Sequence, residues 1–255
     1  NGTAVIQAHS IGMHKERELI TEALKEIYGD KLKAVYDKSK ESLPDRYAEN
    51  IENGYLYGRD KEKQVLENGH IIRVDWEEGQ KTGFFIDQRE NRKLVAQYAP
   101  GRRVLDCFCY AGGFSVYALK AGATEVHSVD SSRTAIKLTD NNINLNFGHG
   151  AKQTSYITDA FDFLKDKSNE YDLMVIDPPA FAKHREARHH AVMGYKRLNA
   201  LAIKGIRPGG IIFTFSCSQV VDKYLFHGAI TAAAIDAGRN VRILRYLSQP
   251  PDHPI

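Results

Sequence analysis

The stretch Val104-Leu105-Asp106-Cys107-Phe108-Cys109-Tyr110-Ala111-Gly112-Gly113-Phe114-Ser115 decides the fold. Its apolar start predicts a short strand, its glycines a turn, and the residues after them a helix. In a doubly wound sheet, ligands bind at such strand ends, where glycine lets the backbone come close to them. The spacing is not G-x-G-x-x-G, and Asp106 stands where a pyrophosphate would lie. A ligand that lacks phosphate and carries a cationic or amino group therefore fits better.

The part of the chain from Lys81 to Ile255 alternates short apolar strands with longer amphipathic helices. This alternation indicates parallel strands joined by crossovers. We expect a helix over Tyr195–Ile206, ended by Pro208-Gly209-Gly210. The fold class predicted for residues 81–255 is α/β, a Rossmann-like domain with a mostly parallel, doubly wound sheet. Its predicted strands are Arg103–Cys107, Glu125–Val129, Thr154–Ile157, Leu173–Ile176, Ile211–Ser216 and Val241–Tyr246.

Residues 1–80 show a different pattern, which predicts a small α+β accessory domain. One amphipathic helix is expected there, closed by Gly29, with its apolar face made by Leu19, Ile20, Ala23, Leu24 and Ile27. Short strands are expected at Tyr55–Tyr57, Gln64–Leu66 and Ile71–Val74, with Asn68-Gly69 as the hairpin turn between the last two. The domain boundary is predicted between residues 80 and 81.

The composition is that of an ordinary globular protein: of 255 residues, 42% are hydrophobic and 26% charged. The apolar runs are far shorter than the roughly 20 residues that a bilayer requires, so we expect a soluble protein without a membrane partner. Three cysteines and no visible secretory leader favour the cytoplasm. A net charge of +3 does not by itself indicate a polyanionic partner. The basic segment 183–190 could contact phosphates, and a solvated loop explains it equally well.

Acidic residues follow successive predicted strands. Asp130 stands 18 residues after Gly112, near the roughly 20-residue offset at which an acid binds ribose hydroxyls. Asp159 could accept a hydrogen bond from an adenine amino group, or could equally cap the helix that starts at Phe161. Each acid alone could be a cap or turn residue, but Asp106 and Asp130 together favour a nucleoside cofactor.

Two further strand ends carry reactive groups. Asp177-Pro178-Pro179 follows the fourth strand, and the prolines fix the backbone so that the acid faces the site. Ser216-Cys217-Ser218 ends the fifth, which makes Cys217 a candidate nucleophile beside Asp177. The alternative is that Cys217 is a small buried hydrophobe, as we expect more strongly for Cys107 and Cys109. Zinc is not expected, because no second ligand pair has suitable spacing.

Taken together, these motifs resemble the RlmI-like family of large-subunit ribosomal RNA cytosine-5 methyltransferases. The resemblance spans roughly residues 70–255 and rests on Phe85–Arg89, Asp106–Phe114, Asp177–Phe181, Gly194-Tyr195-Lys196 and Phe213–Ser218. That family carries an N-terminal PUA domain, which is not recognised here, and continues past the last residues of this chain. Both departures lead us to expect a fragment.

The resemblance implies S-adenosylmethionine as cofactor, Cys217 as the nucleophile that adds to carbon 6 of cytosine, and Asp177 as the acid at nitrogen 3. Its implied cofactor-binding residues are Gln88, Arg89, Asp106, Phe108, Tyr110, Ala111, Gly112, Gly113, Asp130, Ser131, Asp159, Ala160, Asp177 and Pro178. Within this set it assigns Asp106 and the 110–113 turn to the methionine end, Asp130 to the ribose and Asp159 to the adenine. Its implied RNA contacts are Pro179, Phe181, Lys183, Arg185, Arg188 and Lys196. The target base would have to leave its stack to reach such a pocket.

Three alternatives stay open on the sequence alone. The same fold could methylate a ring or exocyclic nitrogen, which needs no cysteine, although Ala180 after the prolines and the intact Ser216-Cys217-Ser218 favour carbon 5. A non-catalytic RNA-binding module would not bind the cofactor. A nicotinamide oxidoreductase is disfavoured by the missing dinucleotide fingerprint. A homodimer is neither indicated nor excluded.

Overall fold

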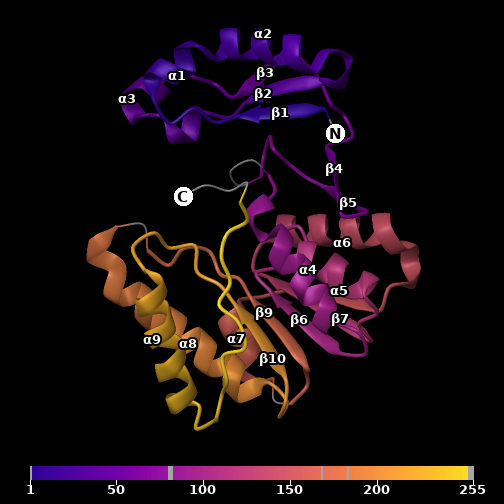
Figure 1. Cartoon of the computed structure of the whole chain (residues 1–255), viewed down its shortest axis with the longest axis vertical. Coiled ribbons are helices and arrows are strands. Elements are labelled where there is room, and N and C mark those ends of the chain that lie inside the picture. Colours follow the sequence, from indigo (N-terminus) through magenta and orange to yellow (C-terminus); the bar gives the residue numbers. More distant parts are fainter. Residues whose placement is uncertain (1, 80–82, 168, 183, 252–255) are drawn as a thin grey trace. The chain divides into compact units, whose positions relative to one another are not determined.

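A computed structural model describes residues 2–79, 83–167, 169–182 and 184–251. The chain divides into two compact units, Asn1–Ile86 and Asp87–Ile255 (Figure 1). The boundary predicted between residues 80 and 81 falls on residues outside the described ones. Within the described residues, no helix combines the length and the apolar character needed to cross a membrane.

The N-terminal unit is an α+β unit, as predicted. Strand β1 (Thr3–Ile6) runs parallel to β2 (Ala34–Asp37), and β2 pairs antiparallel with β3 (Gly54–Gly58). The hairpin of β4 (Gln64–Glu67) and β5 (His70–Arg73) is confirmed, with positive φ at Asn68 (50°) and Gly69 (81°) in its turn. Strands β1 and β2 were not predicted. The helices are α1 (Ile11–Lys15), α2 (Arg17–Tyr28) and α3 (Asp45–Ala48), with short 3-10 turns at Gly29–Lys31 and Lys40–Ser42.

Helix α2 is confirmed, but the prediction of its buried face is wrong. Leu19 and Ile27 are 67% and 73% exposed, whereas Thr21 is the buried residue of the helix. The Thr21 hydroxyl donates to the Arg17 carbonyl oxygen (2.8 Å), so burying it leaves no unsatisfied donor. The apolar periodicity therefore identified the helix without identifying the side that packs.

The second unit contains a five-stranded, wholly parallel sheet in the order β10-β9-β6-β7-β8. The strands are β6 (Arg103–Cys107), β7 (Glu125–Asp130), β8 (Gln153–Ile157), β9 (Leu173–Ile176) and β10 (Ile211–Thr214). The chain adds β7 and β8 on one side of β6 and then returns to add β9 and β10 on the other. This reversal between β6 and β9 is the topological switch point where ligands bind in such sheets.

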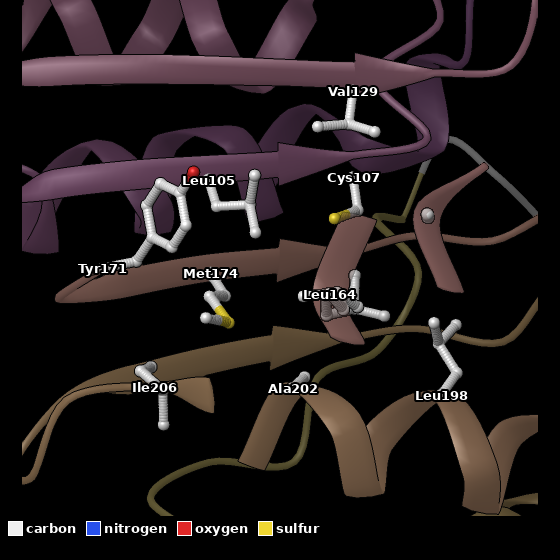
Figure 2. Close-up of a cluster of buried hydrophobic side chains, with 11 residues drawn as sticks. Leu105, Cys107, Val129, Leu164, Tyr171, Met174, Leu198, Ala202 and Ile206 are labelled. Atoms are coloured by element: carbon white, nitrogen blue, oxygen red, sulfur yellow. The ribbon is translucent and has the colours of Figure 1, made fainter. Parts of the chain in front are cut away.

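Helices cover both faces of this sheet (Figure 1), which confirms the doubly wound prediction. Leu105 and Cys107 point to the face covered by α7 and α8, whereas Val104 points to the face covered by α4 and α5. Figure 2 shows the first of these clusters, with the sulfur of Cys107 among apolar side chains. The helices are α4 (Arg89–Tyr98), α5 (Gly113–Lys120), α6 (Arg133–Phe147), α7 (Ala160–Lys165), α8 (Arg188–Gly205) and α9 (Lys223–Asp236), with 3-10 turns at Ile86–Gln88, Gly148–Gly150 and Arg185–Ala187.

Three predicted elements differ from the structure. The least affected is β10, which ends at Thr214, two residues before the predicted end at Ser216. The strand expected at 241–246 is wrong: this segment forms no strand in the described chain, and Ile243 and Leu244 are exposed. A strand needs a neighbour to hydrogen-bond with, and alternating side chains alone do not supply one. Helix α8 contains most of the predicted segment but begins at Arg188, seven residues before the predicted start.

Candidate active site at the carboxyl edge of the sheet

The candidate active site lies where β6, β9 and β10 end. Asp106 lies in β6 opposite Val175 of β9, and Asp177 directly follows β9. Thr214, the last residue of β10, pairs with Ile176 of β9, so the segment that carries Cys217 starts beside Asp177. All three side chains therefore come from the same edge at the switch point.

Asp106 is a buried carboxyl, 1% exposed. Its Oδ2 accepts hydrogen bonds from the Ser115 backbone N–H (3.1 Å) and from the Ser115 hydroxyl (2.7 Å). Its Oδ1 is buried and has no partner among the described residues. Burial raises the pKa of Asp106 to about 7, against the effect of the two bonds from Ser115.

The turn after β6 is held in a left-handed conformation by its neighbours. Phe108, Tyr110 and Gly112 have φ of 61°, 48° and 70°. Such angles are costly for residues with side chains, and they persist where the surroundings fix them. From α6, Thr139 donates its hydroxyl to the Tyr110 carbonyl oxygen (2.9 Å), and Asn142 donates its amide to the carbonyl oxygen of Ala111 (2.8 Å). The turn is thus pre-shaped.

The next two strand ends also carry their predicted acids. Asp130 accepts the Tyr110 N–H on Oδ2 (3.1 Å) and the Ser132 N–H on Oδ1 (2.8 Å), so it ties the end of β7 to the turn after β6. Asp159 is the N-cap of α7 and accepts the backbone N–H groups of Phe161 and Asp162 at 2.8 and 3.2 Å. The capping alternative is therefore confirmed. Of the two predicted neighbours, Ser131 is exposed, whereas Ala160 is buried in the core.

Asp177 is held by the segment at the start of α4. Gln88 donates its amide to Asp177 Oδ2 (3.1 Å), and Asn91 donates to Gln88 Oε1 (2.6 Å). Burial raises the pKa of Asp177 to about 7, and the negative charge of Asp106 acts in the same direction. Arg89 follows Gln88 in the chain, and its Nε lies 3.3 Å from a Glu90 carboxylate oxygen.

Cys217 is the exposed cysteine of the chain, whereas Cys107 and Cys109 are buried. Its Sγ lies 3.6 Å from the carbonyl oxygen of Pro178, the residue after Asp177. The thiol is therefore accessible and lies beside the acidic loop. Cys217 is therefore not the small buried hydrophobe of the alternative prediction. That description applies to Cys107.

The residues predicted to contact RNA are spread over a wider area. Pro179, Arg185 and Arg188 are exposed. Phe181 is half-buried, with its ring centroid 4.7 Å from that of Tyr195. Lys196 Nζ forms an ion pair with Asp236 of α9 (2.8 Å). Lys183 lies outside the described residues.

Several residues of the site were missed from the sequence. Arg92 of α4 is buried, and its positive charge lowers the pKa of both Asp106 and Asp177. The negative charge of Asp87 raises the pKa of Asp177. The sequence signal that could have identified Arg92 is its spacing, three and seven residues before the apolar Val95 and Ala99, which puts a charged residue on the apolar face of the helix. Ser115, Thr139 and Asn142, which fix the turn after β6, carry no such signal.

Comparison with known proteins agrees with this arrangement. The large-subunit ribosomal RNA methyltransferase I of Aeromonas hydrophila is 41% identical over 260 residues, which cover 98% of this chain and 64% of the relative. The crystal structure of SMU.776 with bound SAH has a TM-score of 0.76 at 26% identity, covering 94% of this chain and 61% of that one. A Streptococcus mutans protein described as a SAM-dependent methyltransferase has the same fold, with a TM-score of 0.80 at 23% identity, covering 99% and 64%.

The chain spans about 64% of the length of this curated relative. The family model described as S-adenosylmethionine-dependent methyltransferase matches residues 15–254, nearly the whole chain. The chain belongs to the family of S-adenosylmethionine-dependent methyltransferases.

Proposed function

We propose that this protein methylates RNA, and that its product is 5-methylcytidine in large-subunit ribosomal RNA. The observation that carries the proposal is the exposed thiol of Cys217, which lies 3.6 Å from the carbonyl oxygen of Pro178, the residue that follows Asp177. The name of the Aeromonas hydrophila relative supports ribosomal RNA as the substrate. Such a substrate implies the cytoplasm as the location.

The described residues fit S-adenosylmethionine, the cofactor of this family. Asp106 Oδ1 is a buried acceptor without a partner among the described residues, which suits the ammonium of the methionine end. The turn after β6 lies at the same edge, and Thr139 and Asn142 of α6 hold its backbone in shape. We assign Asp106 and residues 110–113 to the methionine end and Asp130 and Ser131 to the ribose. When bound, the cofactor supplies an electrophilic methyl group on a sulfonium.

The remaining predicted cofactor contacts are proposals of the same kind. Asp159 keeps one carboxylate oxygen, Oδ2, that no capping bond uses, and we assign it to the adenine together with Ala160. The other cofactor contacts that we propose come from around the strand ends of Asp106 and Asp177. They are Gln88, Arg89, Phe108 and Pro178. The N-terminal unit contains none of these residues, and we assign it an accessory role in holding RNA.

The two reactive side chains have complementary tasks. Carbon 5 of cytosine is a poor nucleophile, so the Cys217 thiolate would form a bond to carbon 6, and the electron pair of the 5,6 double bond would move towards nitrogen 3 and carbon 5. Asp177 would hold a proton at nitrogen 3, for which its raised pKa of about 7 is suited. Once carbon 5 carries the methyl group that the cofactor would supply, a base would take its original proton, and the electron pair of that C–H bond would re-form the 5,6 double bond as the C6–S bond breaks and releases the Cys217 thiolate. The proton at nitrogen 3 would return to Asp177.

The test replaces the nucleophile. Cys217→Ala is expected to lower the rate of RNA methylation by at least roughly 1,000-fold while cofactor affinity stays unchanged. Cys107→Ala, which removes a thiol buried in the apolar cluster on the face of β6 opposite to Asp106, is the matched control and keeps its activity. Methyl transfer is measured on ribosomal RNA that lacks the modification, and mass spectrometry maps the product. A Cys217→Ala protein with normal activity would indicate methylation of a nitrogen instead, and a protein that binds no cofactor would indicate a non-catalytic module.

A further inference from the structure

Tyr195 of α8 is a fully buried side chain next to the nucleophile's turn. It is 0% exposed, and its hydroxyl lies 3.0 Å from the hydroxyl of Ser218. Ser218 is itself 5% exposed and directly follows Cys217. Because both hydroxyls are buried, water does not compete for this hydrogen bond, and losing it leaves a buried polar group unsatisfied.

The Tyr195 ring also contacts the acidic loop. Its centroid lies 4.7 Å from that of Phe181, four residues after Asp177. Gly194 makes room for this contact, since a Cβ there would lie 3.0 Å from Phe181 Cδ2. On another side, the ring meets that of Phe226 in α9 edge-on, at 5.2 Å. One side chain therefore touches both the loop of Asp177 and the turn of Cys217.

Ser218 determines the backbone of the turn in which Cys217 is exposed. Its N–H donates to the Ser216 hydroxyl (3.4 Å), and its carbonyl oxygen accepts from the Val221 N–H (3.1 Å). The Tyr195 hydroxyl anchors this short turn to the buried side of α8. A thiol in an exposed turn needs such an anchor to stay beside the Pro178 carbonyl oxygen.

We propose that Tyr195 is a positioning residue for catalysis: through Ser218 and Phe181 it sets the Cys217 sulfur relative to the Asp177 carboxyl. This inference rests on the proposed function, because it takes Cys217 as the nucleophile. Misplacement of a reacting group by about 1 Å can cost roughly 100-fold in rate. The loss of one anchoring hydrogen bond is therefore expected to reduce turnover more than it reduces binding.

The test is a double-mutant cycle of Tyr195→Phe and Ser218→Ala. Each single variant is expected to lower kcat for RNA methylation by roughly 10-fold to 100-fold, with KM for S-adenosylmethionine unchanged. The double variant is expected to be no slower than the slower single one, because both remove the same hydrogen bond. The matched control is Tyr171→Phe, which removes an equally buried hydroxyl, bonded to His127 Nδ1 at 2.7 Å, from a tyrosine at the opposite end of β9.

The rate of alkylation by iodoacetamide shows whether the turn of Cys217 is still folded in a variant. It therefore distinguishes a slightly misplaced thiol from a thiol in a disordered segment. Cys107 and Cys109 are buried, so the native protein reports Cys217. The alkylation rate of Tyr195→Phe is expected to stay within about threefold of the parent, since a small reagent does not need the thiol in one place. The inference is overturned if Tyr195→Phe is as active as Tyr171→Phe, or if its effect adds fully to that of Ser218→Ala. If Cys217→Ala is itself active, the proposed function fails, and this inference fails with it.

Discussion

The substitution Asp106→Asn is expected to stabilise the protein at alkaline pH while removing cofactor binding. The carboxyl has a pKa of 3.8 when solvated and about 7 in the fold. Below pH 4 the Asp106 carboxyl is protonated in both the folded and the unfolded protein. Between pH 4 and 7 only the unfolded state releases the proton, so the free energy of unfolding falls as pH rises, and above 7 the loss is complete. At about 1.4 kcal/mol per pKa unit, the penalty reaches about 4 kcal/mol.

The neutral amide removes this penalty but brings a cost of its own. The Asn oxygen can still accept from Ser115, whereas its NH₂ group replaces an oxygen that has no partner among the described residues. An unsatisfied buried donor costs about 1–3 kcal/mol, so the net gain at pH 8 is about 1–3 kcal/mol. This cost is the same at every pH, so it does not affect the pH dependence of the free energy of unfolding. The change in that free energy on substitution should be more favourable at pH 8 than at pH 5 by about 3 kcal/mol.

Urea unfolding at pH 5 and pH 8, followed by circular dichroism, measures this difference. Tryptophan fluorescence is less suitable, because the single tryptophan, Trp76, lies in the N-terminal unit. Calorimetry with S-adenosylmethionine should show no binding to the variant. If Asp106→Asn changes the free energy of unfolding equally at both pH values, the carboxyl is not held neutral by its burial and the reasoning is refuted.

Two further predictions concern the same edge of the sheet. The rate of RNA methylation should fall as pH rises past about 7, because Asp177 then loses the proton it holds at nitrogen 3. The alkaline decrease in kcat should be absent in Asp177→Asn. If the variant still shows this decrease, a group other than Asp177 causes it. Gly112→Ala should lower the free energy of unfolding by roughly 1–3 kcal/mol, because φ is 70° and the new Cβ would lie 2.7 Å from Thr139 Cγ2. Adding Thr139→Ser, which removes that methyl group, should recover part of the loss in thermal melting; no recovery would mean that φ alone sets the cost.

The parallel sheet could be predicted because its central strands are buried on both faces. Segment 173–176 is wholly apolar, segment 103–107 has Val104, Leu105 and Cys107, and the structure has both strands with the predicted bounds. The predicted segment 241–246 has a similar composition but no partner strand in the described chain, and partners are not encoded locally. The buried side of α2 likewise depends on what packs against it, and Thr21 can be buried there because its hydroxyl is hydrogen-bonded within the helix.

The site could be predicted where its residues lie at strand ends or shortly after them. Asp106, Asp177 and Cys217 come together because parallel strands end at one edge, which the sequence indicates. Residues that act from a helix beside the edge were not predicted, since Arg92 reaches the carboxyls only through the packing of α4. Asp159 satisfies two backbone donors in its own helix, so its position alone did not define its role.

The order of the strands has an evolutionary consequence. The glycine turn that we assign to the cofactor follows β6, whereas the thiol follows β10, with β9 between them in the sheet. A substitution at position 217 is therefore expected to alter the chemistry that we propose at the base while the turn after β6 keeps its shape. An architecture in which donor and nucleophile sit on separate strands lets descendants of one ancestor acquire new chemistry without redesigning how they hold the same small molecule.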